Sequence, residues 1–321
     1  MPDHLAFGLR LRSAEPLPGL PVLAGSDAPD VALHLGRAAP WTDAPRRTRY
    51  TSPAEAPGTS PTVLAYDVPS VPALVLDYAE GIRFEVRADG REVWATWQSP
   101  LTLDDAMTFL LGPVLGYVLR QRGTLALHAS AAVFDGTAVA FIGPGGAGKS
   151  TLAAACARAG HAVVTDDILV VREDGGRWWT TVAPDQVRLW PDAAASLFGP
   201  DAPTTALSPT WPKRGLALDA AGLPRATAPV PLGALLLLAE REPGPAAPRI
   251  EPLGGSEVLL QLVGNTYTNY LLDAEARAAE LQAVGALASA IPVRRLVPRE
   301  GTAGLPILLE RVAHFVTGRG R

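Results

Sequence analysis

One segment of eight residues has the composition and spacing of a phosphate-binding loop. The segment Gly143-Pro144-Gly145-Gly146-Ala147-Gly148-Lys149-Ser150 reads G-x-x-x-x-G-K-[ST]. Glycines at this spacing let successive backbone N–H groups turn toward a phosphate without clashes from Cβ atoms. The lysine can reach the β- and γ-phosphates of a nucleoside triphosphate, and the hydroxyl after it can ligate Mg²⁺. We therefore expect this segment to bind a nucleoside triphosphate.

The sequence on either side of the loop fits that expectation. Ala138–Ile142 before it is a short apolar β-type run, and Thr151–Arg158 after it is strong helix-forming sequence. A loop that opens a helix presents the positive end of the helix dipole to an anion. The chain has 26 arginines but only two lysines, Lys149 and Lys213. In so arginine-rich a sequence, a lysine indicates a position where a compact point charge is needed.

A pair of adjacent carboxylates follows the loop. Asp166-Asp167 lies seventeen positions after Lys149, at the end of an apolar run. One carboxylate could hold Mg²⁺ and the other could accept a proton from an attacking hydroxyl. The alternative is a solvated acidic turn, against which the apolar residues on both sides argue. His128 also ends an apolar run, although a lone histidine in such a place is more often a core residue than a functional one.

Composition and charge narrow the class of protein. With 48% hydrophobic and 19% charged residues, the chain is expected to fold into globular domains. The net charge is −4, and the basic runs, such as Arg46-Arg47 and Arg294-Arg295, are no longer than pairs, so no nucleic-acid partner is expected. The single cysteine, Cys156, allows neither a disulfide framework nor a cysteine-based zinc site.

The sequence also gives expectations about compartment. The first residues, MPDHLAFGLRLRSAE, lack a basic start followed by an apolar core and do not resemble a secretory signal. The longest apolar stretch, around Leu232–Ala239, is far shorter than the ~20 residues that span a bilayer. We expect no membrane association and a cytoplasmic location.

Two regions differ in their predicted elements. Residues 1–102 are predicted to form a smaller β-rich domain, with a hairpin at Asp89-Gly90 and a long loop at residues 38–61. The strands expected there are Leu5–Leu11, Val31–Leu35, Leu74–Asp77, Ile82–Ala88 and Val93–Trp97. Residues 103–321 are predicted to form an α/β domain whose mixed sheet carries the phosphate-binding loop at a strand–helix junction.

The elements expected in the second region alternate in type. The predicted helices are Leu103–Arg122, the helix after the loop, Gly255–Leu262, Asp273–Ala290 and Leu305–Val316. The predicted strands are Leu125–His128, Ala131–Phe134, Ala138–Ile142, Ala162–Thr165, Ile168–Arg172, Trp178–Val182, Leu232–Leu238 and Val293–Val297.

Three spaced motifs together resemble the catalytic core of HPr kinase/phosphorylase, a P-loop group related to phosphoenolpyruvate carboxykinase. They are Leu127-His128-Ala129-Ser130, then Gly143–Thr151, then Gly160-His161-Ala162-Val163-Val164-Thr165-Asp166-Asp167. The resemblance covers about fifty residues, Thr124–Arg172. It implies that Gly143 to Thr151 bind ATP, with Lys149 on the β- and γ-phosphates.

The resemblance also implies roles for the other motif residues. Ser150 and Asp167 would lie on the Mg²⁺ side, and Asp166 would be the general base for the acceptor hydroxyl. His128 would line the site near the transferring phosphoryl group. The two aspartates could exchange their roles.

The chain departs from the family in one signature. A Glu-Ile-Arg-Gly strand and loop expected after the acidic pair is missing, and Val187–Asp192 and Trp211–Arg214 stand in its place. HPr is therefore not the expected substrate. The chain is similar to divergent HPr-kinase-like proteins, some of which phosphorylate a serine of a lasso-peptide precursor. The resemblance therefore implies that the acceptor is a serine hydroxyl of a peptide or small protein.

Two other functions are consistent with the same motifs: a kinase that acts on a small molecule, and a switch protein that hydrolyses a nucleotide. The sequence also leaves open whether the chain forms a homo-oligomer.

Three further residues are candidates for substrate contact. Lys213 and Arg214 lie in a Pro-rich loop, where binding residues are often found; a surface charge is the alternative. Tyr267, with Asn269 and Tyr270, gives a polar-aromatic cluster in an otherwise aliphatic region, which is typical of a segment beside a nucleotide or substrate.

Overall fold

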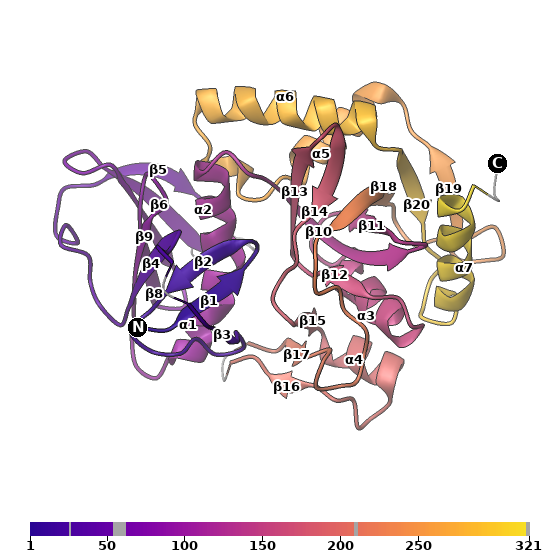
Figure 1. Ribbon diagram of the computed structural model, residues 1–321, viewed down its shortest axis with the longest axis horizontal. Helices are drawn as coiled ribbons and strands as arrows, with labels where there is room; N and C mark the ends of the chain where they lie inside the picture. Colours follow the sequence, from indigo (N-terminus) through magenta and orange to yellow (C-terminus); the bar gives the residue numbers. More distant parts are fainter. Residues whose placement is uncertain (26, 54–61, 209–210, 319–321) are drawn as a thin grey trace. The chain divides into compact units, whose positions relative to one another are not determined.

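The computed structural model describes residues 1–25, 27–53, 62–208 and 211–318 (Figure 1). The fold is mixed α/β, and the chain divides into two compact units. The first unit comprises residues 1–123 together with 207–211 and 270–276; the second comprises residues 124–206, 212–269 and 277–321.

The first unit contains a nine-stranded sheet of order β3-β1-β2-β4-β9-β8-β7-β6-β5. Its elements are β1 (Asp3–Ala6), β2 (Leu9–Arg12), β3 (Val22–Leu23), β4 (Val31–Leu35), β5 (Arg47–Thr51), β6 (Val63–Val68), β7 (Ala73–Tyr78), β8 (Ile82–Arg87), β9 (Glu92–Trp97), α1 (Leu103–Phe109), a π-helical segment (Leu110–Val114) and α2 (Leu115–Gln121).

The helical region of residues 103–121 belongs to the first unit, whereas the sequence placed it in the second domain. Phe109 packs on Tyr78 of β7, and Arg122 pairs with Asp30 at 3.0 Å. The expected single helix is interrupted at Gly112, whose backbone angles are not helical. The next residue, Pro113, disfavours the helical conformation of the residue before it and has no N–H to continue the hydrogen-bond ladder.

Two further differences concern strands of the first unit. The expected strand Leu5–Leu11 is a hairpin that turns at Phe7-Gly8, where both residues have positive φ. The expected loop at residues 38–61 contains β5, and residues 54–61 of that loop lie outside the described part of the chain.

The second unit has a mixed sheet in which β11 lies between β10 and β18. Its strands are β10 (Leu125–Phe134), β11 (Thr137–Ile142), β12 (Val163–Thr165), β13 (Ile168–Asp174), β14 (Arg177–Thr180), β15 (Val187–Leu189), β16 (Thr205–Ala206), β17 (Arg214–Leu216), β18 (Val230–Leu238), β19 (Arg249–Pro252) and β20 (Val293–Val297). Its helices are α3 (Lys149–Arg158), α4 (Pro191–Phe198), α5 (Gly255–Gly264), most of α6 (Ala274–Ala290) and α7 (Leu305–Val316). A 3₁₀ turn (Asn269–Leu271) and the start of α6 lie in or run into the segment 270–276 of the first unit. The two strands expected at 125–134 are one continuous strand.

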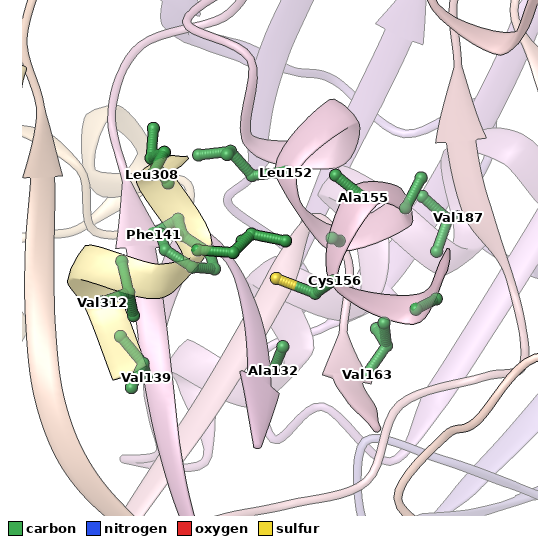
Figure 2. Packing of buried hydrophobic residues seen from close by; sticks show 14 of the residues in the cluster. Ala132, Val139, Phe141, Leu152, Ala155, Cys156, Val163, Val187, Leu308 and Val312 are labelled. Carbon is green, nitrogen blue, oxygen red and sulfur yellow. The ribbon is translucent and has the colours of Figure 1, made fainter. Parts of the chain in front are cut away.

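Both faces of this sheet are covered, which explains why β11 is apolar without alternation. Val139 and Phe141 pack with α3 and α7, and Figure 2 shows Leu152, Leu308 and Val312 around Phe141. The intervening residues of β11 join a second cluster with residues of α5 and α6. Cys156 is fully buried in the first cluster, and burial raises the pKa of its thiol well above the usual range.

Candidate functional site

Three parallel strands bring the motif residues to one edge of the sheet. Both β12 and β11 pair antiparallel with β10, so they run in the same direction, and β18 pairs parallel with β11. The acidic pair follows β12, and the glycine-rich loop follows β11. The carboxyl edge of parallel strands is where ligand sites of α/β sheets are found.

The glycine-rich loop joins β11 to α3 through backbone conformations that favour glycine. Gly146 and Gly148 have φ of +80° and +103°, in the left-handed region that side chains with a Cβ rarely adopt. A Cβ on Gly143 would lie 3.2 Å from Cβ of Ala147 and 3.3 Å from Cβ of Leu238. The loop is therefore closely packed where it leaves the strand.

Lys149 folds back over this loop. Its Nζ donates to the carbonyl oxygens of Gly143 at 2.7 Å and Pro144 at 2.9 Å. The residue is only 6% exposed, and burial lowers its pKa while Asp167 and Asp166 act in the opposite direction. The first turn is fixed to the sheet because Ser130 of β10 donates to the Lys149 carbonyl at 2.7 Å. Phosphate oxygens could replace the two loop carbonyls as partners of the ammonium.

Asp166 lies in a buried environment beside α3. Its Oδ2 accepts the backbone N–H of Arg188 at 2.9 Å, and Ser150 lies close enough to favour the charged form by a hydrogen bond. Burial has the larger effect and raises the pKa of Asp166. Among the residues described, none gives a hydrogen bond to its buried Oδ1.

These surroundings of Asp166 fit a bound Mg²⁺ ion. A buried carboxylate oxygen without a partner, next to a serine hydroxyl, offers hard oxygen ligands of the kind that Mg²⁺ prefers. Within the described part of the chain, no group of three or more His, Cys, Asp or Glu side chains is arranged as a metal site. A magnesium ion that shares phosphate oxygens and waters needs only one or two protein carboxylates.

Asp167 has different neighbours from Asp166 because the chain turns between them. Its φ is +75°, a strained conformation for a residue other than glycine. Its Oδ2 lies 3.3 Å from the guanidinium of Arg188 and accepts a hydrogen bond from the Tyr267 hydroxyl at 3.1 Å. Its Oδ1 lies 3.4 Å from Nε2 of His128. Three side chains from separate segments therefore orient this one carboxylate.

His128 is attached to the site by its backbone as well. Its N–H donates to the Asn265 carbonyl at 2.8 Å, and its ring packs edge-on against Tyr267 with centroids 5.7 Å apart. Burial lowers the pKa of His128, Asp167 raises it, and Lys149 and Lys213 lower it further. The side chain keeps 36% of its exposure, so a neutral imidazole can meet a ligand at neutral pH.

The three substrate candidates lie in different surroundings. Tyr267 joins the Asp167 cluster, and the charge of Lys213 acts on both His128 and Lys149. The Lys213 ammonium lies 5.5 Å from the ring centroid of the exposed Trp190. Arg214 instead donates to the side chain and carbonyl of Thr204, so its described contacts do not bring it to the carboxylates.

Arg188 is the site residue that the sequence did not identify. It lies on β15, nearly buried, and contacts both aspartates through its backbone and its side chain. The signal was its position in the segment that replaces the family signature. Tyr270 stacks on Tyr50 in the first unit, with centroids 4.4 Å apart, and so does not join Tyr267.

Comparison with known proteins finds a distant structural similarity and no match by sequence. No family model matches the chain, and no curated protein matches it. Among solved structures, the chain is similar to the Hpr(Ser) kinase/phosphatase from Coxiella burnetii, with 17% identity and a TM-score of 0.32 over 61% of this chain and 99% of that one. None of the helices in the described residues is long and apolar enough to cross a membrane.

Proposed function

We propose that the chain is an ATP- and Mg²⁺-dependent phosphotransferase that transfers the γ-phosphoryl group to a hydroxyl. The observation that carries the proposal is the different surroundings of two adjacent carboxylates beside Lys149. Asp166 is buried next to Ser150, whereas Asp167 is partly exposed and held by His128, Arg188 and Tyr267. Phosphoryl transfer needs one carboxylate for the metal and another group for the acceptor proton.

The nucleotide end of the site consists of the loop and the first turn of α3. The first N–H groups of a helix have no partner within the helix, and here they follow two glycines with positive φ. In the proposed complex, Lys149 exchanges its bonds to the two loop carbonyls for bonds to the β- and γ-phosphates. Asp166 and Ser150 hold Mg²⁺, which when bound neutralises charge on the phosphates.

At the acceptor end, Asp167 accepts the proton of the attacking hydroxyl. Arg188 and Tyr267 contact one oxygen of this carboxylate, and His128 lies beside the other. These contacts fix the orientation of the carboxylate, which is the main requirement for a base in an in-line transfer. This division of roles is the reverse of the one that the family resemblance implied, in which Asp166 is the base.

The acceptor is proposed to be a serine hydroxyl of a peptide or small protein, as the family resemblance implies. Lys213, one of only two lysines, is proposed to contact the acceptor or the transferring phosphoryl group, because its charge acts on both ends of the site. The alternative acceptors are a small-molecule alcohol and water.

The proposal is tested by phosphate release and transfer from γ-labelled ATP to peptide and metabolite panels. We expect Lys149→Ala to abolish transfer while the fold is kept. Asp167→Asn should lower kcat by ~10² or more at an unchanged Mg²⁺ requirement, and Asp166→Asn should raise the Mg²⁺ requirement. Near-wild-type transfer by Lys149→Ala would refute the site. Exchanged phenotypes of the two aspartate variants would restore the roles that the resemblance implied.

A further inference from the structure

A second cation lies against the glycine-rich loop, on the side away from the carboxylates. Arg241 follows β18 by three residues, and its Nη2 donates to the Ala147 carbonyl at 3.4 Å. A Cβ on Gly148 would lie only 2.7 Å from the same Nη2. The guanidinium therefore lies directly against Gly148, whose φ of +103° itself favours glycine, and would have to move aside for a side chain there.

The topology explains how this arginine reaches the loop. Ile142 pairs with Leu237 in the parallel ladder of β11 and β18, so the residues after both strands emerge at the same edge. Asp166 follows β12, which lies across β10 from β11. The acidic pair and Arg241 therefore approach the loop from opposite sides.

The charge of Arg241 is not neutralised by an acidic partner within the residues that the structure describes. No carboxylate there forms an ion pair with it, and the neighbouring Glu242 is bound by two hydrogen bonds from Arg249. Its hydrogen bond to Ala147 is long and goes to a neutral carbonyl, which is weak compared with a charge-assisted bond to an anion.

We propose that Arg241 binds the polyphosphate of the nucleotide from the β18 side of the loop. This inference rests on the proposed function. A guanidinium presents a planar fork of donors that matches two phosphate oxygens. Lys149 and Arg241 then supply positive charge on two sides of the phosphates, and Gly148 serves both the left-handed turn and the close approach of the arginine.

The test compares the affinities of ADP, ATP and adenosine, measured by calorimetry or by displacement of a fluorescent ADP analogue. We expect Arg241→Gln to weaken ADP and ATP binding about 10- to 100-fold, as expected for loss of a charge-assisted contact, and to leave adenosine binding unchanged. Arg241→Lys should recover part of the loss. Arg311→Gln, at an exposed position of α7, is the matched control and should bind like the wild type. Thermal unfolding checks that each variant folds.

The outcomes separate this inference from the proposed function. If Lys149→Ala weakens ADP binding and Arg241→Gln does not, the inference is wrong and the nucleotide site stands. Equal losses for adenosine and ADP would assign the contact to the nucleoside and also overturn the inference. If the wild type binds none of the three ligands, the proposed function fails and the inference fails with it.

Discussion

At the scale of single residues, Asp166 is proposed to hold Mg²⁺, and its burial lowers the free energy of unfolding of the protein without ligand. Its carboxylate is buried, one of its oxygens lacks a partner in the described structure, and burial raises its pKa. When folding raises the pKa of a group, the contribution of that group to the free energy of unfolding is fully present below its unfolded-state pKa. The contribution is lost as pH rises through the folded-state pKa. Near neutral pH the charged Asp166 therefore destabilises the protein without ligand.

Removing this charge should stabilise the protein while it impairs the proposed site. We expect Asp166→Asn to raise Tm at pH 7.5 without Mg²⁺ by about 2–4 °C, since relieving a buried unpaired carboxylate oxygen corresponds to about 1 kcal/mol or more. The difference should shrink as pH falls, because the wild-type carboxyl then becomes neutral. Differential scanning fluorimetry from pH 4 to 8 measures this.

The same measurement with Mg²⁺ and ADP serves as the control. Ligands should raise the Tm of the wild type, because they bind only the folded state, and should raise the Tm of Asp166→Asn less. A variant that is less stable than the wild type at pH 7.5 would show that the buried carboxylate is better satisfied than its contacts indicate.

At the scale of elements, the tight junction between β11 and α3 depends on one glycine. A Cβ on Gly143 would meet Cβ atoms of Ala147 and Leu238, which can move only with their backbone. We expect Gly143→Ala to cost about 1–3 kcal/mol, the range for overpacking, and to weaken ADP binding. Urea unfolding and calorimetry measure the two effects.

Gly145 in the same loop is the matched control. It has no positive φ, and no heavy atom lies within 4 Å of a Cβ placed there. Gly145→Ala should therefore unfold at the same urea concentration as the wild type. Equal destabilisation by both variants would mean that the loop requires flexibility at every position and not close packing at one.

The elements show which parts of the fold the sequence could predict. Strong periodicity predicted β4, β20 and α7 at their observed residues, because a single buried face fixes each of them. The short polar strand β5 and the strands β15 to β17 were missed. Their pairing depends on partners distant in sequence, which override local propensity.

The residues of the candidate site likewise include some that the sequence could predict and some that it could not. Residue types and spacing selected the glycine-rich loop and the acidic pair, and the family resemblance added His128; in the structure Asp167 lies near both Lys149 and His128. Spacing could not select Arg188, which reaches Asp167 from 21 positions away through a separate small sheet. Nor could it show that a turn with positive φ at Asp167 separates the surroundings of the two aspartates.

At the scale of the whole molecule, the two units are not two consecutive halves of the chain. Residues 207–211 and 270–276 lie far along the sequence but belong to the first unit. Tyr270 packs on Tyr50, and burial raises the pKa of Tyr270 to about 12. Three residues earlier, Tyr267 belongs to the second unit and contacts Asp167.

Substitutions at these two tyrosines should therefore affect different units. We expect Tyr270→Ala to increase hydrogen exchange in β5 and β6, and Tyr267→Ala to increase it around Asp167 and His128, because exchange reports local opening where packing is lost. Hydrogen-exchange mass spectrometry of the full chain measures both patterns. The same pattern from both variants would contradict the assignment of the segment 270–276 to the first unit.

The scarcity of lysine has a consequence for chemical reactivity. Side-chain amines occur only at Lys149 and Lys213; the first has a lowered pKa, and the second lies against an indole ring. An acylating reagent distinguishes an amine from a guanidinium, so among the lysine and arginine side chains only these two can form a stable amide. Lys149 lies near both carboxylates, and the charge of Lys213 acts on Lys149 and His128, so both side-chain amines of the chain belong to the candidate site.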